Sequence, residues 1–199
     1  IRSTLETVLV QSFIDFEVVL VDDGSSDGSM EIVKGIKDSR IRLFSQKNQG
    51  VSAARNAGIR QAVGQYIALL DADDRWEPSY LKEQYDLIQK YPQCGVFAVN
   101  YSYVYSSGAK VPNRVNHLDF CGMDGILKDY FRVAAFSQPP VCSSAVVIRK
   151  DCLESVGGFP VGITSGEDLI TWARLAYRYE IAYSKKCLAW YILREELEL

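Results

Sequence analysis

The side chains best suited to chemistry in this sequence are carboxylates, and they form two clusters that each follow an apolar run. In chain order, the members are Asp22, Asp23, Asp71, Asp73 and Asp74. The apolar runs before them predict strands buried on both faces of a parallel sheet, and such sheets bind ligands beyond the carboxyl ends of their strands. Crowded carboxylates repel one another unless a cation or a raised pKa relieves the repulsion. Hard oxygen ligands suit Mg²⁺ or Mn²⁺, so we expect both clusters to line one crevice that binds such an ion.

Each cluster also has an interpretation without a ligand. The sequence Asp22-Asp23-Gly24-Ser25 is typical of a helix-capping turn, and the second cluster is compatible with a solvated acidic loop. A third acidic pair, Glu167 and Asp168, opens a predicted helix, where carboxylates stabilise the positive end of the helix dipole whether or not they react. Residue types alone leave these alternatives open.

A cation and several amide groups lie at a predicted strand-to-helix junction. Asn48, Gln49 and Gly50 precede a helix that carries Arg55 and Asn56. Because a helix N-terminus attracts anions, phosphate binding is an alternative for this junction. His117 is the only histidine and lies in an irregular stretch without a recognisable partner, so a histidine-based nucleophile triad is not supported.

The elements that position these residues alternate between helix and strand in the first half of the chain. The hydrophobic pattern predicts helices over the first dozen residues and around 29–36, 51–63, 78–88, 151–156 and 167–176. It predicts strands over 16–21, 41–44, 66–70, 96–105 and 144–148, with a long loop over 106–120. This order favours one α/β domain over residues 1–199, with a mixed, mostly parallel sheet flanked by helices.

Composition excludes several other classes of protein. The chain is 48% hydrophobic and 24% charged with a net charge of −3, and its Lys and Arg residues are scattered, which argues against nucleic-acid binding. Its apolar runs are too short to span a bilayer. The five cysteines are widely spaced and form no C-x-x-C pair, which favours reduced thiols in a cytoplasmic protein over disulfides or a zinc site.

Taken in order, these segments resemble the family 2 glycosyltransferases of the GT-A fold. The resemblance is carried by Ser12-Phe13, by residues 16–27, 48–58 and 70–74, by Gly157-Gly158-Phe159, and by Gly166-Glu167-Asp168. It covers nearly the whole chain. It implies a catalytic domain over residues 1–199, with an N-terminal half that binds a nucleotide-sugar and a C-terminal half that binds an acceptor.

The resemblance also implies roles for single residues. Asp22 or Asp23 would bind the nucleotide base, usually uracil, and Arg55 with Asn56 would help hold the nucleotide. Asp71 would contact the ribose or the metal, and Asp73 would coordinate the metal on the diphosphate. Asp168 would be the general base, and Glu167 would position the acceptor or the base.

The implied reaction is transfer of a sugar from a nucleotide diphosphate donor, most often a UDP-sugar, to an acceptor hydroxyl with inversion. A Mn²⁺ or Mg²⁺ ion would stabilise the departing diphosphate. The implied acceptor is a glycan or a lipid-linked molecule in polysaccharide or glycoconjugate assembly, with peripheral contact at the inner face of the membrane as an alternative to a purely cytoplasmic location.

The chain departs from the family pattern in several respects, one of which is that Phe159-Pro160-Val161-Gly162 replaces acidic residues often found after Gly-Gly-Phe. The family begins with a strand and a Pro-x-Tyr-Asn-like turn, whereas this chain starts inside the following helix, so we expect that strand to be missing from it. No Gln-x-x-Arg-Trp sequence occurs near the end, which favours a non-processive enzyme. Two rivals remain: a nucleotidyltransferase, and a module that binds sugar nucleotides without catalysis.

Overall fold

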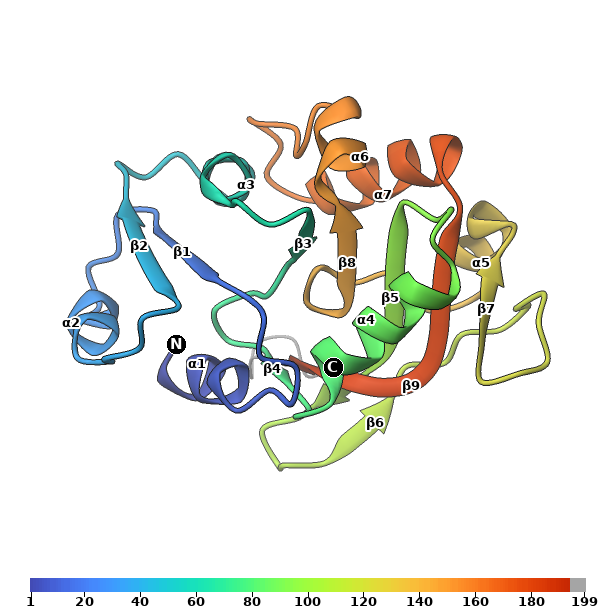
Figure 1. Cartoon of the computed structure of the whole chain (residues 1–199), viewed down its shortest axis with the longest axis horizontal. Coiled ribbons are helices and arrows are strands. Elements are labelled where there is room, and N and C mark those ends of the chain that lie inside the picture. Colours follow the sequence, from blue (N-terminus) through green and yellow to red (C-terminus); the bar gives the residue numbers. More distant parts are fainter. Residues whose placement is uncertain (194–199) are drawn as a thin grey trace.

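The computed structural model describes residues 1–193, which form two sheets with helices packed against them (Figure 1). The smaller sheet pairs β1 (Val18–Asp22) with β2 (Ile41–Ser45) in parallel. The larger sheet has the order β3-β8-β5-β9-β4, with β6 on β5 and β7 on β9. Its strands are β3 (Tyr66–Ala68), β4 (Arg75–Trp76), β5 (Val96–Val104), β6 (Lys110–Pro112), β7 (Asp124–Leu127), β8 (Val146–Arg149) and β9 (Ile181–Ile192).

Helices and strands alternate as far as β3, and the order is less regular after it. The helices are α1 (Arg2–Leu9), α2 (Ser29–Lys34), α3 (Val51–Gln61), α4 (Tyr80–Lys90), α5 (Tyr130–Phe136), α6 (Lys150–Ser155) and α7 (Glu167–Arg178), with a single 3₁₀ turn at Ser143–Ala145. Among the described residues, no helix is long and apolar enough to cross a membrane.

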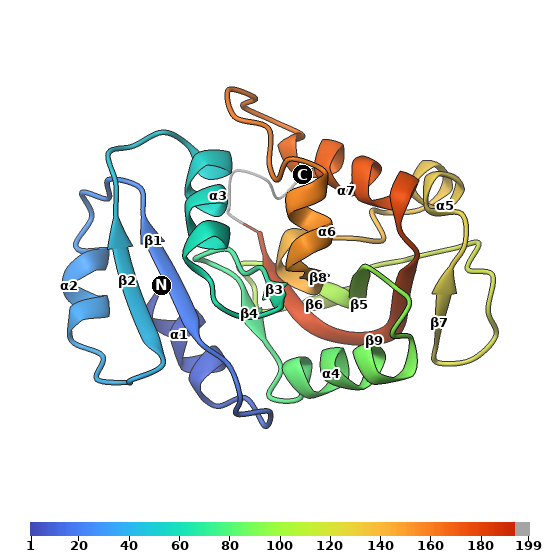
Figure 2. The same ribbon diagram turned by 45° about the horizontal axis from the view of Figure 1, so that its top comes forward.

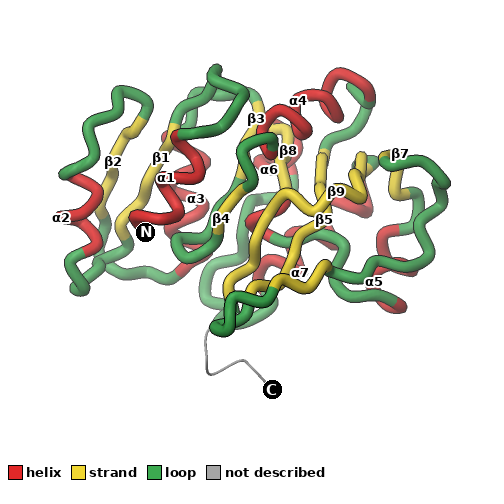
Figure 3. The backbone as a smooth tube through the Cα atoms, turned by 90° about the horizontal axis from the view of Figure 1, so that it is seen from below, coloured by secondary structure: helices red, strands yellow, loops and turns green. Residues whose placement is uncertain are grey.

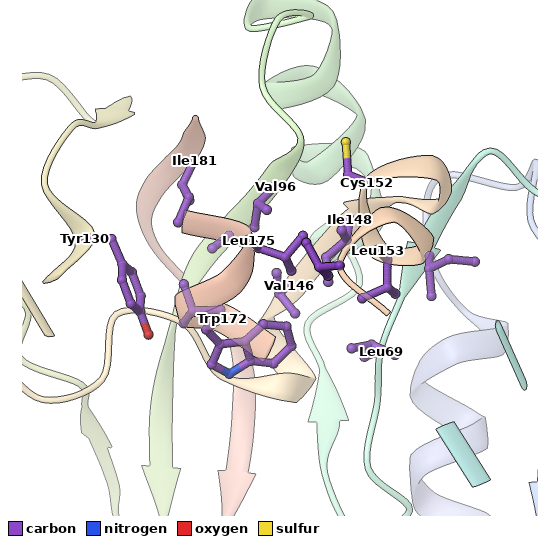
Figure 4. Close-up of a cluster of buried hydrophobic side chains, with 14 of the residues drawn as sticks. Leu69, Val96, Tyr130, Val146, Ile148, Cys152, Leu153, Trp172, Leu175 and Ile181 are labelled. Atoms are coloured by element: carbon purple, nitrogen blue, oxygen red, sulfur yellow. The ribbon is translucent and has the colours of Figure 1, made fainter. Parts of the chain in front are cut away.

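The two faces of the larger sheet support two separate hydrophobic cores, because successive side chains of a strand point to opposite faces. Val96 and Ala98 of β5 belong to the core that α6 and α7 cover, and Figure 4 shows part of it. Phe97 and Val99 belong to the core that α4 covers on the other face. In Figure 2, α4 lies below this sheet and α6 and α7 lie above it. The larger sheet therefore separates α4 on one face from α6 and α7 on the other.

The predicted α/β class is confirmed, and strand directions are mixed. β1 with β2 and β5 with β9 run parallel, whereas β3, β4, β6, β7 and β8 pair with their neighbours in antiparallel fashion. Among the described residues, β1 pairs only with β2 and β3 only with β8, so no strand pairing joins the two sheets. In Figure 3, β2 and β1 form one end of the molecule and the larger sheet the other.

Within residues 1–193, the structure has five helices or strands that the hydrophobic pattern did not predict: β4, β6, β7, α5 and β9. β6 lies inside the predicted loop at 106–120 and is only three residues long. β9 spans 12 residues, but Lys185 and Lys186 interrupt its apolar pattern where its pairing with β5 shifts register between Val99 and Tyr101. A register shift places consecutive side chains out of strict alternation, which removes the period-two signal.

Candidate active site

The acidic loop, residues 71–74 between β3 and β4, is held in place by hydrogen bonds to its one buried carboxylate. Asp74 is 2% exposed and accepts hydrogen bonds from Ser144 Oγ at 2.5 Å and from the Ile192 backbone N–H at 2.9 Å. Ser144 Oγ also accepts a hydrogen bond from the Asp71 backbone N–H at 3.1 Å. Thr4 of α1 donates to the carbonyl of Ala72 at 2.8 Å. The acidic loop is therefore tied to α1, to the 3₁₀ turn and to the end of β9.

A first cavity of about 600 Å³ opens over the acidic loop. Its walls come from the start of α1 and α2, from α3, from the acidic loop and from the end of β9. They comprise Ile1, Asp27, Ser29, Val51, Arg55, Asp71, Ala72, Asp73, Asp74, Tyr191 and Ile192. Segments far apart along the chain thus meet around a group of carboxylates.

Arg55 of α3 connects the acidic loop to the third acidic pair. Its Nη2 lies 2.8 Å from Asp71 Oδ1, and its Nη1 lies 3.1 Å from Glu167 Oε1 at the start of α7. The guanidinium also lies over the ring of Phe159, 5.1 Å from its centroid. Burial lowers the pKa of Arg55, but the neighbouring charges of Asp71 and Glu167 outweigh burial and raise it, so the bridge keeps its positive charge.

Asp168 lies beside this bridge in a half-buried position. Burial raises its pKa, the charge of Glu167 adds to the increase, and the Leu169 N–H and Arg55 oppose it. Burial also raises the pKa of the Cys142 thiol, with contributions from the charges of Asp74 and Asp168. The acidic loop and the first turn of α7 therefore share one electrostatic environment. A carboxylate with a raised pKa is a stronger base than an ordinary one.

Asp74 is the most perturbed acid of the group. Its pKa is raised to about 7, chiefly by burial and also by the charges of Asp71 and Asp73, although the hydrogen bonds from Ser144 and Ile192 act in the opposite direction. Its two oxygens already accept hydrogen bonds inside the protein. We therefore assign it to holding the loop together rather than to contact with a ligand.

The first acidic cluster lies outside the set of residues that line this cavity. Asp22 Oδ1 accepts a hydrogen bond from the Ser25 N–H, which closes a turn after β1. Asp23 accepts hydrogen bonds from Gln46 Nε2 and from the N–H groups of Gln49 and Gly50. Burial raises the pKa of Asp23, but these three donors lower it by more. Because Asp23 takes both amides before α3, these amides are not directed at a phosphate, and the roles of Asp22 and Asp23 toward a base stay predictions.

Asn56 uses its side chain to connect α3 with the Gly-Gly-Phe segment. Its Nδ2 donates to the Phe159 carbonyl at 2.8 Å, and its Oδ1 accepts from the Phe159 N–H at 2.9 Å. Gly158 has a φ of +64°, and a Cβ there would lie 2.5 Å from Asn56 Oδ1. A contact between Asn56 and a nucleotide would have to compete with both bonds, so that contact stays a prediction.

Reasoning from the sequence gave no role at the site to several residues that line the first cavity, among them Asp27, Ser29, Tyr191 and Ile192. The carboxylate of Asp27 accepts a hydrogen bond from the Ser29 N–H at 3.0 Å. Its place four residues after Asp23, the second residue of the first acidic cluster, was a usable signal. Tyr191 and Ile192 carried none, because they reach the cavity only through the pairing of β9 with β4 and β5.

Asp71 and Asp73 are the residues that fit a divalent cation. No group of three or more His, Cys, Asp or Glu side chains forms a metal cage within residues 1–193. Mg²⁺ commonly binds through one or two carboxylates together with substrate phosphates. Two carboxylates on the wall of an open cavity match that donor set, with the other ligands supplied by a bound diphosphate and water.

Comparison with solved structures identifies the class of this fold. TarS residues 1–349 of S. aureus, in a crystal structure described as a complex with UDP-GlcNAc, superposes with a TM-score of 0.79 at 22% identity. The match covers 96% of this chain and 54% of that one. The fold is accordingly of the GT-A type.

The chain belongs to glycosyl transferase family 2, whose family model matches residues 1–157. An uncharacterized glycosyltransferase of Rickettsia felis is 30% identical over 89% of this chain and 28% of its own length. The putative teichuronic acid biosynthesis glycosyltransferase TuaG of Bacillus subtilis is 29% identical over 97% of this chain and 73% of its own. A poly-beta-1,6-N-acetyl-D-glucosamine synthase of Staphylococcus epidermidis is 25% identical over 99% and 48%. This chain therefore spans between about a quarter and three quarters of the length of these relatives.

Proposed function

We propose that this domain transfers a sugar from a UDP-sugar donor to an acceptor hydroxyl by a single displacement with inversion. The observation that carries the proposal is the Arg55 bridge, which links Asp71 on the wall of the first cavity to Glu167, directly beside Asp168. A base and a donor-binding acid within one site are what an inverting transfer requires. The structural neighbour TarS is described in complexes with UDP-GlcNAc and with UDP, which supports a uridine diphosphate donor.

The donor would bind with its diphosphate over the acidic loop. Asp71 and Asp73 would hold a Mn²⁺ or Mg²⁺ ion, which supplies positive charge where the leaving diphosphate gains negative charge. Arg55 would remain close to that diphosphate and keep Asp71 in position through its 2.8 Å contact. Asp74, buried beneath, would hold the loop in the shape that presents both carboxylates.

Asp168 would act as the general base. It would accept the proton of the acceptor hydroxyl as the oxygen attacks the anomeric carbon from the face opposite the leaving diphosphate. Burial raises its pKa, which makes it a stronger base than an ordinary carboxylate, and general base catalysis contributes about 10²–10⁴-fold in rate. Glu167, held by Arg55 at 3.1 Å, would orient the acceptor or the base.

The acceptor would be a glycan or a lipid-linked molecule of a surface polysaccharide. The names of two relatives, one in teichuronic acid biosynthesis and one a poly-N-acetylglucosamine synthase, support this class. Cytoplasmic location and peripheral contact with a membrane stay part of the same proposal.

Titration calorimetry with UDP tests the donor half of this proposal. We expect binding that needs Mn²⁺ or Mg²⁺, is lost in EDTA and weakens at least about tenfold in Asp73→Ala, because a charge-assisted contact of this kind is worth more than about 1.4 kcal/mol. Asp86→Asn, an exposed carboxylate paired with Lys82, is the matched control. Metal-independent binding that survives in Asp73→Ala would remove Asp73 as a ligand.

The product of the reaction separates this proposal from its rivals. Proton NMR of the transferred sugar should show the opposite anomeric configuration to the donor, together with release of UDP. Release of pyrophosphate would favour a nucleotidyltransferase, and binding without turnover of any donor would favour a non-catalytic module.

A further inference from the structure

A second cavity of about 330 Å³ lies between the larger sheet and the segment that follows β6. Asn100 of β5 and Tyr183 and Lys185 of β9 line it from the sheet. Asn113, Arg114 and Asn116 line it from the covering segment. None of these six residues lines the first cavity.

The walls of the second cavity are built from buried polar groups. Asn113 is 3% exposed; its N–H donates to the Tyr101 carbonyl at 2.8 Å, and its Nδ2 donates to the Pro139 carbonyl at 3.0 Å. Asn100 Nδ2 donates to the Asn113 carbonyl at 3.0 Å, which ties the covering segment to β5. These bonds fix the asparagines rather than leaving them as mobile surface groups.

Two polar atoms of these walls have no hydrogen-bond partner within the part of the chain that the structure describes. They are Asn113 Oδ1 and the hydroxyl of Tyr183, a residue that is fully buried. Buried polar groups are nearly always hydrogen-bonded, and leaving one unpaired is unfavourable. Unpaired groups of this kind beside a cavity favour a polar occupant.

The charge of the second cavity is positive. Arg114 and Lys185 contribute two cations, and none of the residues that line the cavity is acidic. Lys185 Nζ donates to the Phe120 carbonyl at 3.2 Å and lies over the Phe120 ring, which holds its stem in place. In a chain with a net charge of −3, a cavity with two cations and amide groups favours an oxyanion with neighbouring hydroxyls.

The second cavity lies on the face of the sheet that also holds Asp168. Leu118, which lines it, packs against the core cluster that contains Tyr130 and Trp172. Burial and the charge of Asp168 together raise the pKa of Tyr130 to about 12, so Tyr130 lies within the field of that carboxylate. The second cavity and Asp168 therefore lie on the same face of the larger sheet.

We infer that the second cavity binds a sugar unit of the acceptor that carries a carboxylate or a phosphate, at a distance from the reacting end. The oxyanion lies between Arg114 and Lys185, and the sugar hydroxyls bond to Asn113, Asn116 and Tyr183. This inference rests on the proposed function, because it assigns the occupant as part of the acceptor. It makes the enzyme selective for an anionic acceptor.

Binding of small anionic probes tests the assignment. The probes are trigalacturonate for the carboxylate, ribose 5-phosphate for the phosphate, and maltotriose as the uncharged control, each measured by NMR titration of the ¹⁵N-labelled chain. We expect at least one anionic probe to shift the amide signals of residues 113–118 and maltotriose to bind at least about tenfold more weakly. We also expect saturating UDP to leave that binding unchanged.

Two double variants give the matched comparison. Arg114→Gln with Lys185→Gln should weaken the anionic probe at least about tenfold, whereas Lys82→Gln with Arg132→Gln, which removes two exposed cations elsewhere, should not. Equal binding in both double variants, displacement by UDP, or no binding of either anionic probe would overturn the inference. Failure of UDP itself to bind would instead count against the proposed function. The NMR titration would still show whether the second cavity binds the anionic probes.

Discussion

The buried carboxylate of Asp74 makes a prediction about stability and pH that can be worked through in detail. Burial raises its pKa in the folded protein to about 7 from the ordinary value of 3.8. A raised pKa means that the folded state binds a proton more tightly than the unfolded state does. The stability that this proton confers is fully present below pH 3.8 and is lost as the pH rises through about 7.

The magnitude follows from the size of the shift. Each unit of pKa difference corresponds to about 1.4 kcal/mol, so Asp74 alone lowers the free energy of unfolding by about 4 kcal/mol between pH 4 and pH 8. Asp74→Asn removes the ionisation but keeps the shape. Its Oδ1 can accept from the Ile192 N–H, and its Nδ2 can donate to Ser144 Oγ. The variant should therefore lack this fall in stability and exceed the wild type most clearly at pH 8.

Urea unfolding, followed by tryptophan fluorescence at steps between pH 4.5 and pH 8, measures the effect. Trp76 is a suitable reporter because its Nε1 donates to the Ser144 carbonyl at 2.7 Å. The difference between wild type and Asp74→Asn isolates one group, since other acids such as Asp23 titrate equally in both. Asp86→Asn serves as the exposed control. Parallel pH profiles for wild type and Asp74→Asn would refute the reasoning.

Three further changes probe the parts that hold the site. Gly158→Ala should lower the free energy of unfolding by about 1–3 kcal/mol, measured as a lower melting temperature, because the positive φ and the contact of a Cβ with Asn56 at 2.5 Å both oppose the change. Gly108→Ala, which has a positive φ but open space around it, should lower the stability less, and equal losses of stability would argue against the contact with Asn56. Asp23→Ala removes the acceptor of the Gln49 and Gly50 backbone N–H groups, so faster hydrogen exchange of these two amides is expected, and unchanged exchange would contradict it. Arg55→Gln should weaken UDP binding and slow transfer together, whereas a loss of stability alone would assign it a structural role.

The sequence predicted the elements whose apolar pattern is regular. The helices at 51–61, 80–90 and 167–178 and the strands at 18–22 and 41–45 lie where the pattern placed them. Their signal is local, because apolar residues recur along each of them at the spacing of a helix or form a continuous apolar run typical of a strand. The strand at 181–192 was missed, since two lysines and a register shift break its alternation.

Only part of the candidate site could be predicted, because some of its contacts join residues that are far apart along the chain. Asp71, Asp73 and Arg55 line one cavity, and Arg55 contacts Glu167 beside Asp168, as convergence of distant acids required. Residue type alone did not indicate that Asp74 is a buried anchor while its neighbours line the cavity, because that depends on Ser144 and Ile192, which are far along the chain.

The central claim is that Asp168 removes a proton from the acceptor, and that the donor binds on the other side of Arg55, at the acidic loop. Release of UDP from a panel of UDP-sugars, measured for wild type and Asp168→Asn alongside the UDP affinity of each, tests it most directly. We predict that Asp168→Asn lowers turnover at least about 100-fold, the smallest effect typical of a lost general base, while the affinity for UDP changes little. Turnover at the wild-type rate in Asp168→Asn, or loss of UDP binding with the activity, would contradict the account.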